Sequence, residues 1–530
     1  MRSTSPARLR NCATTVSVRT IMRIRCAPSL LAIGLFVSSP FLPGCGSPSG
    51  GGIDSPSLGV DTGGTQDVAE ARSKVMAGTI PDPNTITIEG FLSEHDIPLT
   101  TPPGAPEIFA ATALTWRKPY NEPAAEAEVF VGLGTTIDLA NFQRHPQNLA
   151  VVIDRSGSMS NPASSADSRS KMDAVKQALH SLVDQLTGDD LLTVVSFNDN
   201  AAVDLQATPG DQQSKIMPKI DALTPRGNTD LYKGLKTGFD RLAASAGGER
   251  DTRLILFTDA QPTSGKTDPA TIVELARQYA DQGIGFTLMG VGVDYGTELA
   301  NDIAQVRGGN AYFLSDSERI AGIFDNDFKF LVSPAGYDLT LQLNVPNGIG
   351  IRRIYGVPDY VPGAHSATVH VPTLFFSSRQ GGGAIVVRLT FAQAPTFEQT
   401  VVLGDASLSY TLPDGTLRSQ AGQLTLPAGL APGGEPAFFS DDAARRAALL
   451  LDTALVFQAG VRAAWDNRYA DGAKLIQDFL PVFDAASMGL SDRTAPGSRG
   501  LSDERALLEH LEGMLTGRYS FYPAYYGYVY

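Results

Sequence analysis

The stretch Leu149-Ala150-Val151-Val152-Ile153-Asp154-Arg155-Ser156-Gly157-Ser158-Met159 decides the fold of this chain. Its apolar first half is typical of a strand that is buried on both faces of a parallel sheet. The apolar run stops at a carboxylate, Asp154, which is followed by the hydroxyls of Ser156 and Ser158 in a turn that contains Gly157. Three hard oxygen donors are therefore expected at the carboxyl end of one strand. Such oxygens suit Mg²⁺, which takes six oxygen ligands at about 2.0–2.1 Å.

The residues around this stretch predict an α/β fold. Between residues 148 and 334, further apolar strands are expected at 191–197, 254–257 and 284–291. They alternate with segments in which apolar residues recur at helical spacing, such as Met172, Val175, Leu179, Leu182, Val183 and Leu186. This alternation predicts a doubly wound, Rossmann-like parallel sheet with helices on both faces. Ligands of such sheets bind outside the carboxyl ends of the strands.

Two other loops are expected at the same edge of the sheet. Thr229 lies in a glycine-containing loop just before an amphipathic helix, and Asp259 directly follows the strand at 254–257. Taken singly, Ser156-Gly157-Ser158 is an Asx or hydroxyl turn, Thr229 is a helix cap and Asp259 is a turn former. Taken together and in this order, the five residues predict a cation site made of Asp154, Ser156, Ser158, Thr229 and Asp259.

The spacing of these residues resembles the metal-ion-dependent adhesion site of von Willebrand factor type A domains. The pattern Asp-Xaa-Ser-Xaa-Ser at 154–158 is followed by Thr229 and then by Asp259. The resemblance implies direct ligation by Ser156 and Ser158, ligation by Thr229 when a partner is engaged, and ligation by Asp154 and Asp259 directly or through water. It also implies Mg²⁺, with Mn²⁺ or Ca²⁺ as alternatives, and a protein partner that supplies an acidic side chain to the metal.

Composition and missing motifs argue against several other classes of function. Residues 1–44 carry six arginines and no acidic side chain, so their removal would lower the formal charge from −14 to −20. A chain this acidic is a poor candidate for binding nucleic acid. The sequence contains no Gly-Xaa-Ser-Xaa-Gly elbow and no P-loop, and its histidines lack zinc-site spacing apart from His365 and His370, which are more simply interpreted as surface residues. We therefore expect no enzymatic activity, and hydrolysis by the bound metal remains the least favoured reading.

The amino-terminal region predicts export and lipidation. The apolar run at 30–37 follows Arg23 and Arg25, which is the layout of a signal peptide covering 1–44, with Met22 as the expected true start. The sequence Leu42-Pro43-Gly44-Cys45 resembles a bacterial lipobox, which implies a lipid on Cys45 that anchors the protein to a membrane. The alternative is an ordinary signal peptide with an incidental cysteine. Gly46 after the cysteine favours the outer membrane or a periplasm-facing location.

The remaining residues predict further regions on either side of the type A domain at 148–334. Residues 45–80 are interpreted as a disordered tether and 81–147 as an amino-terminal β segment, with strands beginning at Thr85. Residues 335–430 predict a β-sandwich domain, and 431–530 predict a helical region with an aromatic tail. Because a chain enters and leaves an α/β domain at adjacent ends, strands of the two β regions are expected to pair in one composite sandwich.

Two functions fit these predictions. The first is a lipid-anchored protein of the bacterial cell envelope whose type A domain binds a protein partner through a divalent cation, in adhesion or complex assembly. The alternative is a regulatory or accessory subunit of a membrane complex, channel or ATPase. Adhesion predicts exposure to protease added to intact cells, whereas an accessory subunit is expected to face the periplasm.

Overall fold

The computed structural model describes most of the chain after residue 58. The described residues are 59–62, 64–65, 68–138, 142–163, 169–259, 262–292, 305–314, 328–357, 360–363, 365–377, 384–493 and 498–519, with Leu299, Asp302 and Phe324 singly. The predicted signal peptide 1–44, the predicted lipidation site Cys45 and the aromatic residues 521–530 lie outside the described residues.

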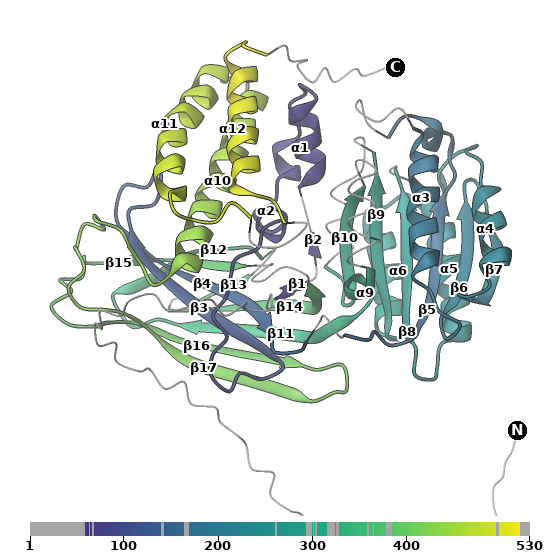
Figure 1. Ribbon diagram of the computed structural model, residues 1–530, viewed down its shortest axis with the longest axis horizontal. Coiled ribbons are helices and arrows are strands. Elements are labelled where there is room, and N and C mark those ends of the chain that lie inside the picture. The colour runs from purple at the N-terminus through teal and green to yellow at the C-terminus, as the bar shows by residue number, and fades with distance from the viewer. Residues whose placement is uncertain are drawn as a thin grey trace, which may run out of the picture. The chain divides into compact units, whose positions relative to one another are not determined.

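A seven-stranded, mostly parallel sheet confirms the predicted α/β fold (Figure 1). Only β7 runs antiparallel to its neighbour, which is β6. In spatial order the strands are β2 (Gly64–Thr65), β10 (Gly309–Leu314), β9 (Ile284–Val291), β8 (Asp251–Thr258), β5 (Gln147–Asp154), β6 (Leu191–Phe197) and β7 (Ala201–Pro209).

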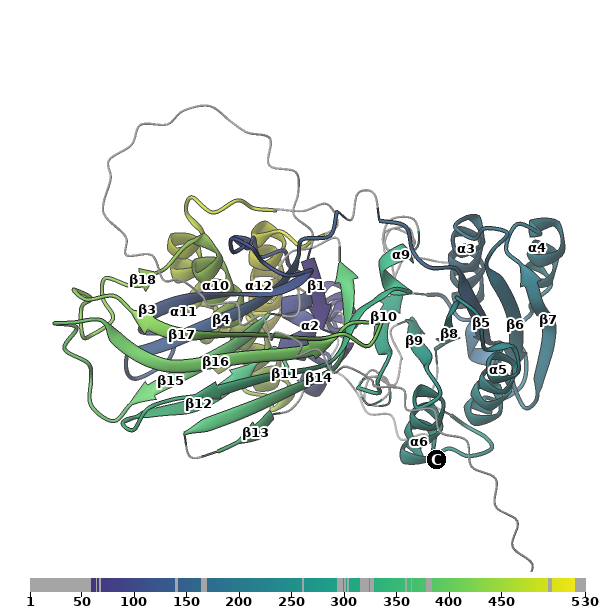
Figure 2. The ribbon, with the colours of Figure 1, turned by 90° about the horizontal axis from the view of Figure 1, so that it is seen from below.

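Strand β5 is buried on both faces, as its apolar run predicts. Leu149, Val151 and Ile153 belong to the core that includes α3 (Lys171–Asp184) and α4 (Gln213–Asp221). Ala150 and Val152 belong to the core on the other face, with α5 (Leu231–Ser245) and α6 (Pro269–Ala280). Figure 2 shows these helix pairs on opposite faces of the sheet. Because successive side chains of a strand point to opposite faces, a strand between two helix layers must be apolar throughout.

The two predicted β regions join in one eleven-stranded sheet. Strand β4 pairs with β15 antiparallel, from Ala127↔Leu389 to Val131↔Ile385. The prediction that the two regions pair is therefore confirmed. The strands are β1 (Gly59–Thr62), β3 (Ile108–Arg117), β4 (Glu126–Thr135), β11 (Pro334–Asn344), β12 (Ile349–Tyr355), β13 (Tyr360–Pro362), β14 (Ser366–Ser377), β15 (Ile385–Phe391), β16 (Val401–Thr411), β17 (Leu417–Leu426) and β18 (Phe438–Phe439).

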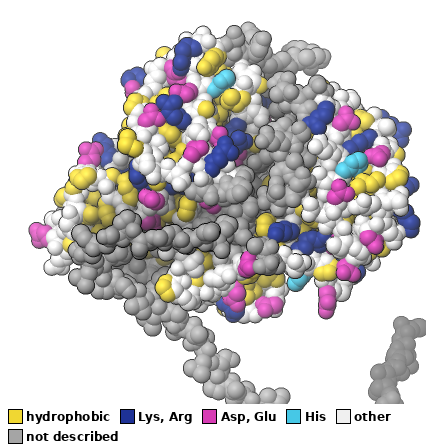
Figure 3. Space-filling view, in the orientation of Figure 1, with side chains coloured by type: hydrophobic (Ala, Val, Ile, Leu, Met, Phe, Trp, Pro, Cys, Tyr) yellow, Lys and Arg dark blue, Asp and Glu magenta, His cyan; other side chains and the backbone are white. Residues whose placement is uncertain are grey.

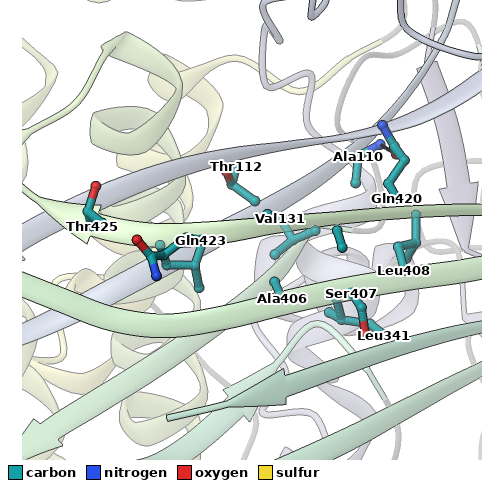
Figure 4. A pocket seen from close by; sticks show the side chains of 13 residues that line it. Ala110, Thr112, Val131, Leu341, Ala406, Ser407, Leu408, Gln420, Gln423 and Thr425 are labelled. Atoms are coloured by element: carbon teal, nitrogen blue, oxygen red, sulfur yellow. Dashed lines mark hydrogen bonds between the residues drawn. The ribbon is translucent and has the colours of Figure 1, made fainter. Parts of the chain in front are cut away.

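Strands β3 and β17 meet without a backbone ladder between them among the described residues. The amide of Ala110 on β3 instead donates a hydrogen bond to Oε1 of Gln420 on β17, at 2.8 Å. A groove of about 190 Å³ lies beside this contact, lined by residues such as Thr112, Leu408 and Gln423 (Figure 4). A side chain, rather than a strand pairing, therefore bridges this part of the sheet.

Five helices share a further core, and two of them lie in the amino-terminal region. They are α1 (Ala69–Met76), α2 (Ile88–Ser93), α10 (Asp442–Trp465), α11 (Tyr469–Ser487) and α12 (Leu501–Leu515). Helix α10 is long and apolar enough to cross a membrane by length and composition alone, but 78% of its most apolar window is buried inside the protein. We therefore interpret α10 as a core helix.

Helices α1 and α2 correct two predictions from the sequence. The predicted tether at 45–80 is wrong for the described residues from 59 to 80, because β1 and β2 pair in the two sheets and α1 follows, with Val68, Ala71 and Val75 buried in the helical core. The strand predicted from Thr85 is also wrong, since residues 83–85 form a 3₁₀ turn and α2 follows from Ile88. The hydroxyl of Thr87 accepts a hydrogen bond from the amide of Gly90 at 3.0 Å and so caps α2. This cap favours helix over the alternating Thr and Ile pattern.

Surface charges of both signs are interspersed on the face seen in Figure 3. Exposed ion pairs also form within helices, such as Lys474 with Asp478 at 2.7 Å on α11 and Lys236 with Asp240 at 2.8 Å on α5. Exposed pairs of this kind contribute less than about 1 kcal/mol to stability. Removing one partner of a buried ion pair lowers stability by more than this, because it leaves a buried charge without an opposite charge.

A buried cluster of four charged side chains joins the eleven-stranded sheet to α10. Arg117 on β3 contacts Glu128 on β4 at 2.7 Å and Asp452 on α10 at 2.6 Å. Arg388 on β15 contacts the same two carboxylates, at 2.9 Å and 3.0 Å. Each arginine therefore bridges both acids, and Arg388 also lies 3.3 Å from Glu122 at the margin of the cluster. Asp452 is the member that the helix contributes, so this cluster ties α10 to the sheet.

A second buried cluster joins α1 to α12. Arg72 contacts Glu94 through Nε at 2.6 Å and Glu504 through Nη1 at 2.8 Å. The other carboxylate oxygen of Glu504 lies 3.3 Å from Nε2 of His95. Burial alone would raise the pKa of Glu504, but the charge of Arg72 and the contact with His95 lower it to about 2.

Replacement of Glu504 by glutamine is expected to destabilise the protein at pH 7 by about 3 kcal/mol. A carboxylate whose pKa falls on folding stabilises the folded state above its unfolded pKa, 4.5 for Glu504, and loses this contribution as pH falls toward about 2. The difference in unfolding free energy between wild type and Glu504→Gln should therefore shrink from pH 5 to pH 3. Urea unfolding at several pH values measures it, with Glu509→Gln on the exposed side of α12 as the control. A difference that stays constant from pH 7 to pH 3 would contradict the role of this carboxylate.

Candidate functional site

Asp154 lies where β5 ends, and its carboxylate is fixed from two sides. The backbone amide of Ser156 donates to Oδ1 at 2.8 Å, and the hydroxyl of Thr258, the last residue of β8, donates to Oδ2 at 2.7 Å. Burial raises the pKa of Asp154 to about 6, against the effect of these two hydrogen bonds. The nearby carboxylate of Asp259 acts in the same direction as burial. The site therefore holds a buried acid that a cation would stabilise in its charged form.

Ser156, Ser158 and Asp259 bring their side-chain oxygens together. The two serine hydroxyl oxygens lie 3.0 Å apart, and the Ser158 hydroxyl donates to Oδ1 of Asp259 at 2.9 Å. Adjacent oxygens around an octahedral Mg²⁺ with metal–oxygen distances of about 2.0–2.1 Å are themselves about 2.9 Å apart. The spacing of these three oxygens therefore fits neighbouring ligands of such a cation.

The loop that carries Thr229 packs against the Asp154 turn. The amide of Gly157 donates to the carbonyl oxygen of Gly227 at 2.9 Å, and the amide of Arg226 donates to the carbonyl oxygen of Arg155 at 2.6 Å. Gly227 has φ +79°, and a Cβ there would lie 2.4 Å from Oδ2 of Asp199. Glycine is therefore required where the two loops meet.

Thr229 is buried and is held through its backbone. Its amide donates to the hydroxyl of Thr263 at 3.0 Å, and its carbonyl oxygen accepts hydrogen bonds from the amides of Thr263 and Ser264. Its own hydroxyl has no hydrogen-bond partner among the described residues. Asp230, not Thr229, caps α5, because its side chain accepts from the amide of Lys233. The cap interpretation of Thr229 is therefore wrong, and its hydroxyl stays available as a ligand.

Lys171 is a member of the site that the sequence motif did not predict. Its Nζ lies 2.8 Å from Oδ2 of Asp259, and its side chain is 3% exposed. The chain makes room for it at Gly292, where φ is +85° and a Cβ would lie 2.3 Å from Cε of Lys171. One signal existed in the sequence, since Lys171 precedes Val175 by one helical turn and thus falls on the apolar stripe of α3.

The five predicted ligand residues fit a hard divalent cation, and three of the five would contribute hydroxyl oxygens. Within the described residues, no group of three or more His, Cys, Asp and Glu side chains is placed to hold a metal ion. A cation at Asp154 would therefore depend on the hydroxyls of Ser156, Ser158 and Thr229 together with the carboxylates. With Asp154 charged, Lys171 leaves the set one net negative charge, so a divalent cation would give it one net positive charge. Such a centre attracts an anionic group.

Comparison with known proteins agrees with the fold. Residues 148–326 match the model of the von Willebrand factor type A domain, and this part of the chain is a domain of that kind. The uncharacterized protein YfbK of Escherichia coli is 24% identical over 294 residues, which are 54% of this chain and 49% of YfbK. Inter-alpha-trypsin inhibitor heavy chain H2 of Mus musculus is 29% identical over 182 residues, which are 33% of this chain and 18% of that protein.

A solved structure has the same kind of domain. It is a von Willebrand factor type A protein from Catenulispora acidiphila, with 17% identity and a TM-score of 0.47, and the match covers 77% of this chain and 96% of that one. The chain spans about half the length of YfbK, so the function of the whole protein is not carried over from it. The match to the family model confirms the predicted type A domain, while the cation site stays a prediction.

Proposed function

We propose that the type A domain binds a protein partner through a divalent cation held by Asp154, Ser156, Ser158, Thr229 and Asp259. The observation that carries this proposal is the clustering of hydroxyl and carboxylate oxygens at 2.9–3.0 Å from one another at the carboxyl ends of β5 and β8. Mg²⁺ is the first choice because the ligands are hard oxygens, and Mn²⁺ or Ca²⁺ are alternatives.

The charge of the site favours an acidic group on the partner. A cation held by five protein oxygens keeps one of six positions open. The ammonium of Lys171 adds a fixed positive charge 2.8 Å from Asp259. A carboxylate from a partner would fill the open position and balance the net positive charge of the loaded site. The bound cation thus supplies a positive, unsaturated centre, and the chain's residues fix where it is presented.

The proposal places the protein in the bacterial cell envelope. The signal peptide at 1–44 and a lipid on Cys45 would export the chain and hold it at a membrane, in the outer membrane or facing the periplasm. The protein is then a binding component in adhesion or complex assembly, and no catalytic step is assigned to it.

Partner capture tests this function. The purified protein is immobilised and exposed to detergent-solubilised envelope proteins of its own source, once with Mg²⁺ and once with a chelator. We expect a partner that is retained with Mg²⁺ and released by the chelator, and that is lost with Ser158→Ala. Ser160→Ala is a matched control, because Ser160 lies in the same turn but is exposed and donates only to the carbonyl oxygen of Gly157. Equal capture with and without the chelator would refute binding through a cation.

A further inference from the structure

Near the amino end of β8 lies a buried arginine, Arg253, that forms no ion pair with a carboxylate among the described residues. Arg253, on β8, is 2% exposed. Its Nη1 donates to the hydroxyl of Thr287 at 2.9 Å and to the carbonyl oxygen of Gly308 at 3.0 Å. Both acceptors are neutral. Burial lowers the pKa of Arg253 to about 10, which leaves the guanidinium charged at neutral pH. A buried charge that lacks an opposite charge is costly, and such charges are normally paired.

The other two nitrogens of Arg253 are unused. Among the described residues, neither Nε nor Nη2 forms a hydrogen bond. A Cβ on Gly285 would lie 2.8 Å from Nη2, 2.9 Å from Cζ and 3.3 Å from Nε, so Gly285 packs closely on the guanidinium and a larger residue there would displace it. The ring of Phe375 lies with its centroid 5.0 Å from Cζ and packs on the guanidinium. Nε and Nη2 form the side of a guanidinium that takes two oxygens of one oxyanion.

Arg253 lines a cavity of about 240 Å³. The cavity is also lined by Arg250, Asp251, Arg307 and Tyr337. Arg250 donates through Nε to the carbonyl oxygen of Asp189 at 2.7 Å. This acceptor is neutral, so the bond does not neutralise the charge of Arg250. Three arginines and one aspartate give the lining two net positive charges, in a chain whose formal charge is −14.

The remaining charges near the cavity are weakly paired. Arg307 lies 3.6 Å from Asp338 in a pair that is nearly half exposed on both sides. Asp251 lies 3.8 Å from Nδ1 of His145, and both side chains are exposed. Neither acid forms an ion pair with Arg253, although the charge of Asp251 acts to raise the pKa of Arg253. Because Arg253 lies near the amino end of β8 and Asp154 at the carboxyl end of the adjacent parallel strand, this cavity is separate from the candidate cation site.

We propose that this cavity binds a phosphate group, which accepts hydrogen bonds from Nε and Nη2 of Arg253. A phosphate group carries a charge of about −1.5 to −2 at pH 7, which comes closer to the two net positive charges of the lining than the single charge of a carboxylate does. Bound phosphate would connect β8 and β9 with the start of β11, since Arg253, Gly285 and Tyr337 all line the cavity. Binding should therefore stabilise the folded protein.

Thermal unfolding and calorimetry with inorganic phosphate test the proposal in the full chain, in buffer without divalent cations and at constant ionic strength. We expect saturable binding and a higher Tm for wild type. Arg253→Gln should lose both effects, and Arg307→Gln should weaken binding about tenfold because it removes one unit charge from the lining. Arg277→Gln, an exposed arginine on α6 outside the cavity, is the matched control and should bind like wild type.

Gly285→Ala keeps every charge but forces the guanidinium of Arg253 to move, because its Cβ would lie 2.8 Å from Nη2 and 2.9 Å from Cζ, so it tests the site even if Arg253→Gln does not fold. It should abolish binding. A phosphate monoester that binds more tightly than inorganic phosphate would identify the terminal phosphate of a larger molecule as the ligand, and the reverse order would identify the free ion. No saturable phosphate binding by wild type, unchanged binding by Gly285→Ala, or equal binding of acetate would each overturn the proposal.

Discussion

Replacement of Asp154 by alanine is expected to reduce the affinity of the protein for Mg²⁺ and Mn²⁺ by at least about 100-fold, which is about 2.7 kcal/mol. Asp154 is a fully buried carboxylate that its neighbours hold in place from both oxygens. The attraction between a unit charge and a divalent cation at ligand distance is worth several kcal/mol even when it is strongly screened. Both proteins are first stripped of metal with a chelator. Isothermal titration calorimetry with Mg²⁺ or Mn²⁺ then measures the difference in affinity.

The replacement Lys171→Met should change the metal affinity in the opposite direction in the same assay. Its ammonium contacts Asp259 at 2.8 Å, so its removal frees that carboxylate and makes the site more negative. We expect metal affinity to rise by about tenfold or more. Asp281→Ala, an exposed acid at the end of α6, should change nothing. Unchanged metal affinity in Asp154→Ala would remove the cation site from the proposed function, and reduced affinity in Lys171→Met would show that the lysine supports the ligand set instead of opposing the cation.

Replacement of Asp452 by alanine is expected to destabilise the protein by about 3–5 kcal/mol. The variant leaves Arg117 and Arg388 buried with Glu128 as the one carboxylate that contacts both. The loss arises because the two buried arginines then share Glu128 and the partly exposed Glu122, which lies 3.3 Å from Arg388, so their charge is only partly compensated. Chemical unfolding followed by circular dichroism measures the change.

Asp442→Ala is the control for Asp452→Ala, because Asp442 lies in the same helix but is exposed in its first turn. It should cost less than about 1 kcal/mol. The quadruple replacement Asp452→Leu, Glu128→Leu, Arg117→Met and Arg388→Met should recover part of the stability, since apolar residues remove all four buried charges. A loss in Asp452→Ala no larger than in Asp442→Ala would mean that α10 is held to the sheet by apolar packing alone.

The parts of the fold that the sequence predicted are those whose signal is local. β5 is an unbroken apolar run because helices cover both of its faces, so its residues alone identify it. Helix α1 could not be recognised in this way. Its buried face includes Glu70 and Arg72, and Arg72 is compensated by Glu504, 432 residues away in the chain. Apolar periodicity identifies a helix by the apolar residues on its buried face, so it misses a helix whose buried face carries a charged residue paired with a distant helix.

The residues of the candidate site also divide into those with a local signal in the sequence and those without one. Asp154, Ser156 and Ser158 were predicted from one turn, and Thr229 and Asp259 from their place after strands or before a helix. Lys171 was missed because a lysine at the start of a helix is usually exposed, and only the fold brings it to Asp259. Arg253 was missed for a related reason, since its lack of a carboxylate partner is a property of the folded neighbourhood and not of its sequence position.

The position of β1 limits how far the folded protein can stand from a bilayer. Gly59 pairs with Ser377 and Gly134, so the chain is already part of the eleven-stranded sheet fourteen residues after Cys45. A segment of that length spans at most about 50 Å, whereas a tether up to residue 80 would span about 120 Å. A lipid on Cys45 would therefore confine the protein to a thin layer above the membrane, and a partner would have to enter that layer to be bound.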